Sequence, residues 1–419
     1  MPALGAQMIR TVSAATVVLI ATVAWGATTF EPSHRLTAAP QSTGSGTATA
    51  PPPVGTPTHG VEHRVQQSIH TPEPIPPPAG PTPTAVATAT PSPTPTSTPS
   101  PSPPPSLSSF VTVCGTALCA DGMRFDERGA TAYGQYGNAV DEVALARRAN
   151  LNTLELVEFD TQYHTLSDTE SSATWDRVDA FIAAAHAGGL HVILNLSEYG
   201  QSLQAAGQPP VTTDWGPYLS FIANRVNTVT GVRYADDPTI AMVELWGEIP
   251  APDYPNPVGT TQQITDFYSR SLAEWRADAP NILVSSGGFS YINDPNSGID
   301  WKTIMADPDN AACDVEVNSS ADLSVSVPSV SSFCRALGKP WFLAAWSSCF
   351  GASRGTWDLD YWSSDAAMAA HARVMVNVAD GVSVPAPFGD DFWNIGDTAA
   401  VTGTCDIGPQ FPLTFAAIE

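Results

Sequence analysis

The chain has 419 residues, with 41 acidic and 17 basic side chains and a formal net charge of −24. A charge of this sign and size argues against a nucleic acid or an anionic membrane surface as partner and favours a neutral ligand. The length allows more than one domain.

An uncharged apolar stretch, residues 11–30, follows Arg10 near the amino terminus. It is long enough to cross a bilayer once and is longer than the apolar cores of most signal peptides. Ala24 and Gly26 place small residues at the two positions that a signal peptidase recognises. A cleaved signal (residues 1–30) and a retained membrane anchor therefore both stay open. In either case we expect a chain that is secreted or anchored at the outer face of the cell membrane.

The next segment, residues 31–108, is dominated by Pro, Thr, Ser, Ala and Gly. Such a composition cannot bury a core and favours extended polyproline conformations. We therefore predict a disordered linker, which serves either as a spacer that holds the following domain away from a membrane or wall, or as a passive connection.

Composition changes near Phe110, and residues 109–419 alternate strand and helix patterns. The apolar runs that predict strands are 152–159, 191–196, 240–245, 282–286, 314–318, 341–345 and a stretch near 392–395. Between them, amphipathic spacing predicts helices at 175–189, 215–226 and 262–275. Short strands separated by single helices indicate parallel strands that are buried on both faces.

About eight such units in this length predict an α/β fold, a (β/α)8 TIM barrel. An open doubly wound sheet is the alternative. No glycine-rich phosphate loop follows any of the strands, which weakens that alternative.

Six cysteines in an exported chain favour three disulfides. The pairs suggested by order along the chain are Cys114 with Cys119, Cys313 with Cys334, and Cys349 with Cys405, although sequence alone does not fix the connectivity. The spacing resembles no zinc site, and we expect no metal and no cofactor.

Active sites of such barrels lie at the carboxyl ends of the strands. The polar and aromatic residues near those ends are Glu155, Glu158, Glu198, Glu248, Asn318, Trp346 and Trp393. Carboxyl pairs suit cleavage of glycosidic bonds, and aromatic rings offer flat faces for sugars.

Four segments resemble the β-mannanases of glycoside hydrolase family 5. The domain start, 110–133, is similar to their opening hairpin and first strand. Residues 224–245 are similar to the approach to their fourth strand, and 338–346 and 392–397 to their seventh and eighth. The resemblance implies a barrel of retaining enzymes that cut β-1,4-linked glycans.

Carried over residue by residue, the resemblance is incomplete. Glu248 matches the acid/base glutamate, and Trp393 matches the tryptophan that floors the sugar site. The nucleophile glutamate falls at Ala345, the asparagine before the acid/base residue at Gly247, and the strand-two arginine at Glu155. A methyl group cannot form a glycosyl ester, so this alignment excludes double displacement with the usual pair.

Other residues are expected near the cleft as contacts for substrate. These are Trp246, Trp346, Tyr199, Glu198 and Glu158, together with Trp393. Glu158, Glu198 and Asp390 are also candidates for a relocated carboxylate that would act with Glu248 in an inverting mechanism, which needs a separation of roughly 6.5–9.5 Å.

Three hypotheses follow. In the first, which we favour, the chain is a glycan-binding module that has lost its catalytic activity. In the second it is an active hydrolase with a relocated partner for Glu248. In the third it is a structural domain for surface display. The expected partner is a neutral β-linked polysaccharide, with possible membrane anchorage through residues 11–30, and we expect a monomer.

Overall fold

The computed structural model describes residues 107–133, 138–157, 169–252, 256–351, 360–382, 384, 386–397, 400 and 403–419, without the side chains of 169–173 and 321. The predicted signal or anchor segment and almost all of the predicted linker lie outside these ranges. Within them, no helix is both long and apolar enough to cross a bilayer.

Eight parallel strands form one sheet in the order β8-β7-β6-β5-β4-β13-β10-β9. Their bounds are β4 Glu127–Tyr133, β5 Thr153–Val157, β6 His191–Asn195, β7 Ile240–Glu244, β8 Leu283–Ser285, β9 Cys313–Val317, β10 Trp341–Ser347 and β13 Gly389–Trp393. The two end strands meet through a single parallel bridge between Phe289 and Val315, which closes the sheet into a barrel. The predicted (β/α)8 architecture is thereby confirmed.

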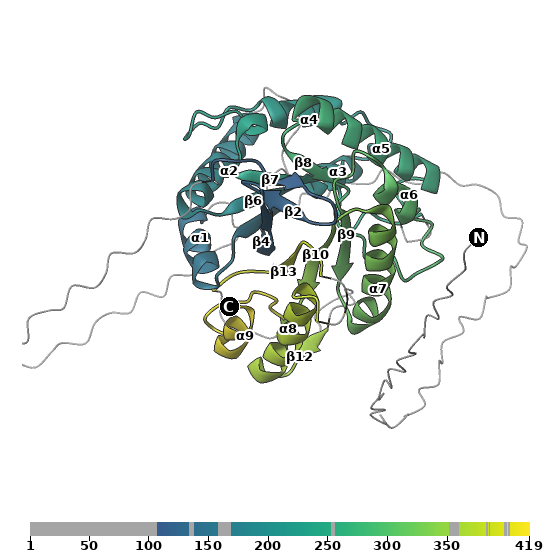
Figure 1. Ribbon diagram of the computed structural model, residues 1–419. Helices are drawn as coiled ribbons and strands as arrows, with labels where there is room; N and C mark the ends of the chain where they lie inside the picture. The colour runs from purple at the N-terminus through teal and green to yellow at the C-terminus, as the bar shows by residue number, and fades with distance from the viewer. Residues whose placement is uncertain are drawn as a thin grey trace, which may run out of the picture. The chain divides into compact units, whose positions relative to one another are not determined.

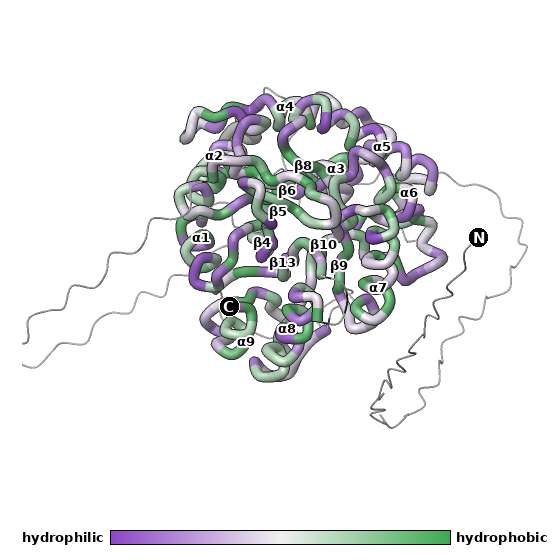
Figure 2. The backbone as a smooth tube through the Cα atoms, viewed as in Figure 1, coloured by the Kyte–Doolittle hydropathy of each residue, from purple (hydrophilic) through white to green (hydrophobic). Residues whose placement is uncertain are grey.

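Helices surround this barrel (Figure 1). They are α1 Ala139–Arg148, α2 Thr169–Gly188, α3 Ser197–Ala205, α4 Gly216–Asn224, α5 Thr261–Asp278, α6 Trp301–Ala306, α7 Ser320–Leu337, α8 Asp365–Ala379 and α9 Pro412–Ile418, with a 3-10 turn at Tyr234–Asp236. The three helices expected from amphipathic spacing correspond to α2, α4 and α5. In Figure 2 the strands at the centre are largely hydrophobic, while hydrophilic residues concentrate in the outer helices and loops.

A small antiparallel sheet precedes the barrel and consists of β1 Thr112–Val113, β2 Leu118–Ala120 and β3 Met123–Phe125. Val111 and Leu118 are buried in one cluster with Ala241, Phe342 and Phe388, which lie toward the amino ends of the barrel strands. The sheet therefore covers the amino-terminal end of the barrel and leaves the carboxyl end for the site.

Three disulfides join the pairs expected from the order of the cysteines. Cys114–Cys119 lies in the small sheet, Cys313–Cys334 links β9 to α7, and Cys349–Cys405 ties the short strand β11 Cys349–Phe350, which pairs with β12 Tyr361–Trp362, to the segment after β13. Three disulfides in one chain indicate an oxidising compartment.

Successive side chains of a strand point to opposite faces of the sheet, and this alternation decides which of them face the interior of the barrel. In β9, Cys313, Val315 and Val317 face the helices, and Asp314 and Glu316 therefore face the interior. The same alternation turns Glu155 of β5 and Glu244 of β7 inward. The interior thus contains several carboxyl groups, a pattern that determines the chemistry of the site.

Candidate functional site

Glu248 lies just beyond the end of β7, at the carboxyl end of the barrel. Its side chain is exposed, and its backbone φ of 51° is in the left-handed region, which is uncommon for a residue other than glycine. The backbone N–H donates to the carbonyl of Gly288 at 2.9 Å. The Oε1 atom accepts from Asn318 Nδ2 at 3.0 Å and from Ser290 Oγ at 3.3 Å. Glu248 is therefore held in place while facing solvent, as a ligand-binding carboxylate would be.

A second carboxyl group, that of Glu316, lies directly beside Glu248. Ser290 Oγ is 3.0 Å from Glu316 Oε2, so one hydroxyl contacts both carboxyl groups. Burial raises the pKa of Glu316 well above its usual value, and the charge of Glu248 and a hydrogen bond to it raise that pKa further. Glu248 thus shares the Ser290 hydroxyl with a buried acid, only 7% exposed, whose raised pKa favours its protonated form.

Glu316 is absent from the residues predicted at the strand ends, because it lies within its strand and Asn318 lies at the end. The alternation in D314-V-E-V-N318 was the available signal, because it places Asp314 and Glu316 on one face of the strand.

Two glycines just beyond the ends of β7 and β8 make room for Glu316. A Cβ atom added to Gly288 would lie 2.4 Å from Glu316 Cγ and 3.0 Å from Ala344 Cβ. One added to Gly247 would lie 3.1 Å from Glu316 Oε1. A larger side chain at Gly247, such as the asparagine that the resemblance would place there, would meet the carboxyl group of Glu316.

Ala345 is the register neighbour of Glu316 on the adjacent strand β10. The ladder is irregular between Leu343 and Ala345, so Ala344 is an extra residue in a bulge, and Ala345 is half-buried. At the position where the resemblance implies a nucleophile there is a methyl group, with the carboxyl group of Glu316 one strand away.

Glu155, which the resemblance aligned with an arginine, lies deeper in the barrel. It accepts from Thr131 Oγ1 at 2.6 Å and from Asn195 Nδ2 at 2.8 Å, and Asn195 also donates to Glu244 at 3.2 Å. Burial raises the pKa of both glutamates, and for Glu244 the nearby charge of Glu155 adds to this effect. None of the salt bridges among the described residues involves these interior carboxyl groups.

A further acid pair, Glu127 and Asp391, lies near the amino end of the barrel. Burial raises both pKa values well above normal, and the charge of a neighbouring carboxyl group, Asp390 for Glu127 and Glu127 for Asp391, raises them further. A Cβ added to Gly129 would lie 1.6 Å from Asp391 Oδ1, so glycine is required beside this pair. Asp390 points the other way, toward α8, and accepts from Trp346 Nε1 at 3.0 Å. The structure therefore does not place Asp390 beside Glu248.

The aromatic residues separate into two groups. Trp393 is half-buried at the end of β13, with its ring centroid 4.8 Å from that of Tyr133, which is 38% exposed. The peptide bond between Trp393 and Asn394 is cis. These two rings form a partly exposed aromatic surface at the carboxyl end of the barrel, available for stacking on a sugar.

The other three aromatic candidates are packed in the core. Trp246 is 1% exposed and lies against Trp215 and Gly200, and Trp346 is 1% exposed and lies against Phe392. Tyr199 is 8% exposed and stacks on Tyr218 with centroids 4.0 Å apart. A ring enclosed by other side chains has no free face for a sugar, so none of the three is assigned to binding below.

Two candidate carboxylates remain. Glu198 lies in the first turn of α3 and is half-buried, while Glu158 lies outside the described residues. Among the residues that are described, no cluster of His, Cys, Asp or Glu has a geometry suited to a metal ion.

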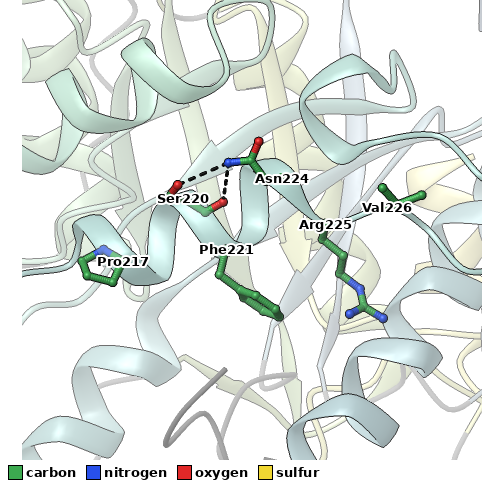
Figure 3. A pocket seen from close by; sticks show the side chains of 6 residues that line it. All are labelled: Pro217, Ser220, Phe221, Asn224, Arg225 and Val226. Atoms are coloured by element: carbon green, nitrogen blue, oxygen red, sulfur yellow. Dashed lines mark hydrogen bonds between the residues drawn. The ribbon is translucent and has the colours of Figure 1, made fainter. Parts of the chain in front are cut away.

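A shallow hollow of about 500 Å³ on α4 lies outside the barrel and away from the strand ends (Figure 3). It is lined by Pro217, Ser220, Phe221, Asn224, Arg225 and Val226. A hydrogen bond joins two of these lining residues, because Asn224 Nδ2 donates to the carbonyl of Ser220 at 2.9 Å. It shares no residue with the group around Glu248.

Solved structures with the same architecture include several enzymes that act on β-linked glycans. An endo-1,4-β-mannanase from Rhizomucor miehei superposes with a TM-score of 0.57 at 19% identity, over 74% of this chain and 98% of the enzyme. An endo-β-1,4-mannanase from Thermotoga petrophila gives 0.54 at 17%, over 70% and 76%. A β-glucanase from Saccharophagus degradans gives 0.51 at 14%, over 77% and 97%.

The fold is that of the family 5 glycoside hydrolases. No protein-family model matches the sequence, and no curated protein matches it either. At these identities the likeness establishes the family 5 fold alone. The activity has to be argued from the residues at the carboxyl end of this family 5-like barrel.

Proposed function

We propose that this family 5-like barrel binds a neutral β-1,4-linked polysaccharide at its carboxyl end and does not cleave it by double displacement. The observation that carries the proposal is the place of Glu316. The carboxyl group nearest to Glu248 is buried and joined to it through one hydroxyl, and the neighbouring position on β10 is Ala345. A retaining mechanism requires a free second carboxylate about 5–5.5 Å away.

The proposal that the site binds a glycan rests on side chains that are exposed or half-buried at the carboxyl end of the barrel. Glu248 is exposed, Ser290 and Asn318 are half-buried beside it, and Trp393 with Tyr133 provides aromatic surface. Hydroxyl groups of a sugar can bond to the first set while its ring stacks on the second. The net charge of −24 is compatible with an uncharged polysaccharide.

We further propose that the protein acts outside the cell, as a monomer that is secreted or held at the membrane through residues 11–30. The three disulfides support the extracellular location.

A second candidate, hydrolysis, is favoured by one observation. Glu316 supplies a carboxyl group next to Glu248, one strand from the position implied for the nucleophile. If a bound sugar separated the two groups to roughly 6.5–9.5 Å, a single-displacement reaction would be possible.

One assay separates the candidates. The purified protein is incubated with mannan, glucomannan and carboxymethyl-cellulose, and both reducing ends and retention on the insoluble polymer are measured. We expect retention without new reducing ends. Reducing ends that disappear in Glu248→Gln would instead establish hydrolysis, and neither retention nor cleavage would indicate a structural display domain.

Trp393→Ala is expected to weaken retention about tenfold, because loss of an aromatic face costs on the order of 1 kcal/mol or more. Trp301→Ala, a matched removal of a half-buried tryptophan on α6, should leave retention unchanged. The measurement is a depletion isotherm on insoluble polymer. If the Trp393 variant and the wild type bound with equal affinity, Trp393 would not be part of the glycan site.

A further inference from the structure

The contact between Glu248 and Glu316 requires a proton that the hydroxyl between them cannot provide. Ser290 has one O–H group, yet its Oγ lies 3.0 Å from Glu316 Oε2 and 3.3 Å from Glu248 Oε1. It can donate to only one of these oxygens. Two ionised carboxylates can only accept, so one of the two must be protonated for the remaining contacts to be favourable.

The surroundings decide which residue holds that proton. Glu316 is 7% exposed, whereas Glu248 is exposed to solvent and accepts from Asn318 Nδ2. The groups that face Glu316 from other elements are Glu244 of β7 and Tyr268 of α5, neither of which is a cation. Burial and the charge of Glu248 both raise the pKa of Glu316. The proton therefore belongs on Glu316.

We propose that Glu316 is a positioning residue of the glycan site, which holds a proton, shares it with Glu248, and thereby keeps Glu248 in place as an acceptor for sugar hydroxyl groups. This inference rests on the proposed binding function. It explains why Gly247 and Gly288 carry no side chain, because a Cβ at either position would approach the side chain of Glu316.

Glycan binding should then depend on pH. While the pair holds its proton, the two carboxyl groups attract each other through it. Once the pH rises beyond the pKa of Glu316, two like charges separated by one hydroxyl repel, and Glu248 leaves its position. The affinity should fall about tenfold for each pH unit above that point.

The test is retention of the full-length protein on insoluble mannan and glucomannan between about pH 5 and about pH 9, a range that covers buried glutamates. Wild type should lose affinity at the alkaline end. Glu316→Gln, whose amide donates to Glu248 at every pH, should bind with a flat profile. Glu127→Gln, the same change at the opposite end of the barrel interior, should keep the wild-type profile. A flat wild-type profile, or a slope that survives in Glu316→Gln, would overturn the proposal.

Ser290→Ala provides a second variant with little risk to folding, since this side chain is half-buried. The Ser290 hydroxyl bond lowers the pKa of Glu316, so its removal should move the loss of binding to higher pH. An unchanged profile would contradict the proposal.

A readout without glycan separates failure of this inference from failure of the proposed function. A protonated carboxyl group has its own infrared carbonyl band. In the difference between the spectrum of the wild type and that of Glu316→Gln, this band should be present at pH 6 and vanish as the pH rises. If no glycan binds at any pH but the band behaves in this way, the proposed function fails while the shared proton stands. An absent band refutes the shared proton whether or not glycan binds.

Discussion

We expect the free energy of unfolding to fall by several kcal/mol when the pH rises from about 5 to about 8, because the folded barrel holds protons that the unfolded chain releases. Burial raises the pKa of each of the interior acids. For Glu127, Glu244, Glu316 and Asp391 the pKa lies well above normal, and for Asp314 it is raised to about 6.

The sign follows from proton counts. A carboxyl group whose pKa is higher in the folded state binds more protons when folded, so its contribution is complete below the unfolded pKa and is lost as the pH rises through the folded one. Glu142 in α1, raised from 4.5 to about 7, corresponds to about 3 kcal/mol on its own. Asp179 acts in the opposite sense, since Arg225 and Tyr234 help to lower its pKa, but that effect is confined to pH values near and below 3.8.

The measurement is urea unfolding at several pH values. The strongly negative net charge, formally −24 for the whole chain, also destabilises the fold at high pH. About 1 M sodium chloride screens that contribution and leaves buried pairs largely unaffected. Glu127→Gln should reduce the pH dependence in salt, because it removes one raised group. Stability that is constant or rises toward pH 8 in high salt would contradict the predicted protonation of the interior.

Gly288→Ala is expected to destabilise the protein by about 1–3 kcal/mol, because the new methyl group would lie 2.4 Å from Glu316 Cγ. The same change in a Glu316→Ala background should cost less, since the Glu316 atoms at 2.4 and 2.8 Å are gone, while Ala344 Cβ at 3.0 Å remains. A double-mutant cycle by urea unfolding should thus give a coupling energy of about 1 kcal/mol or more.

Gly216→Ala is the matched control for this cycle. A Cβ there would approach the end of the Asp214 side chain at 3.1 Å and the carboxyl group of Glu274 at 3.6 Å, both ends of flexible side chains, so the change should be nearly neutral. If Gly288→Ala costs the same with and without Glu316, then Gly288 does not make room for that carboxyl group.

The barrel was predictable because its strands are buried on both faces, so that β6 and β7 appear as continuous apolar runs in the sequence. The position of Glu248 followed from the same strand ends. The disulfide pairs followed from order along the chain, because each joins cysteines that are neighbours in sequence.

The partner of Glu248 was not predicted because it depends on contacts among several strands. Glu316 reaches Glu248 through space left by Gly247 and Gly288, which are far from each other and from Glu316 in the sequence. The orientation of Trp346 was not predicted either, for a similar reason. The bulge at Ala344 adds one residue to β10, which turns Trp346 from the barrel interior toward the helices.

The seam of the barrel coincides with the candidate site. β8 and β9 are joined by the bridge between Phe289 and Val315. Ser290 follows the first side of this seam and Asn318 the second, and both bond to Glu248. A polysaccharide bound to Glu248, Ser290 and Asn318 would bridge β8 and β9 at the place where the sheet has the fewest backbone hydrogen bonds. Binding at the proposed site would then stabilise closure of the barrel, and slower amide hydrogen exchange at Glu316, whose N–H donates to Phe289 O across the seam, would report it.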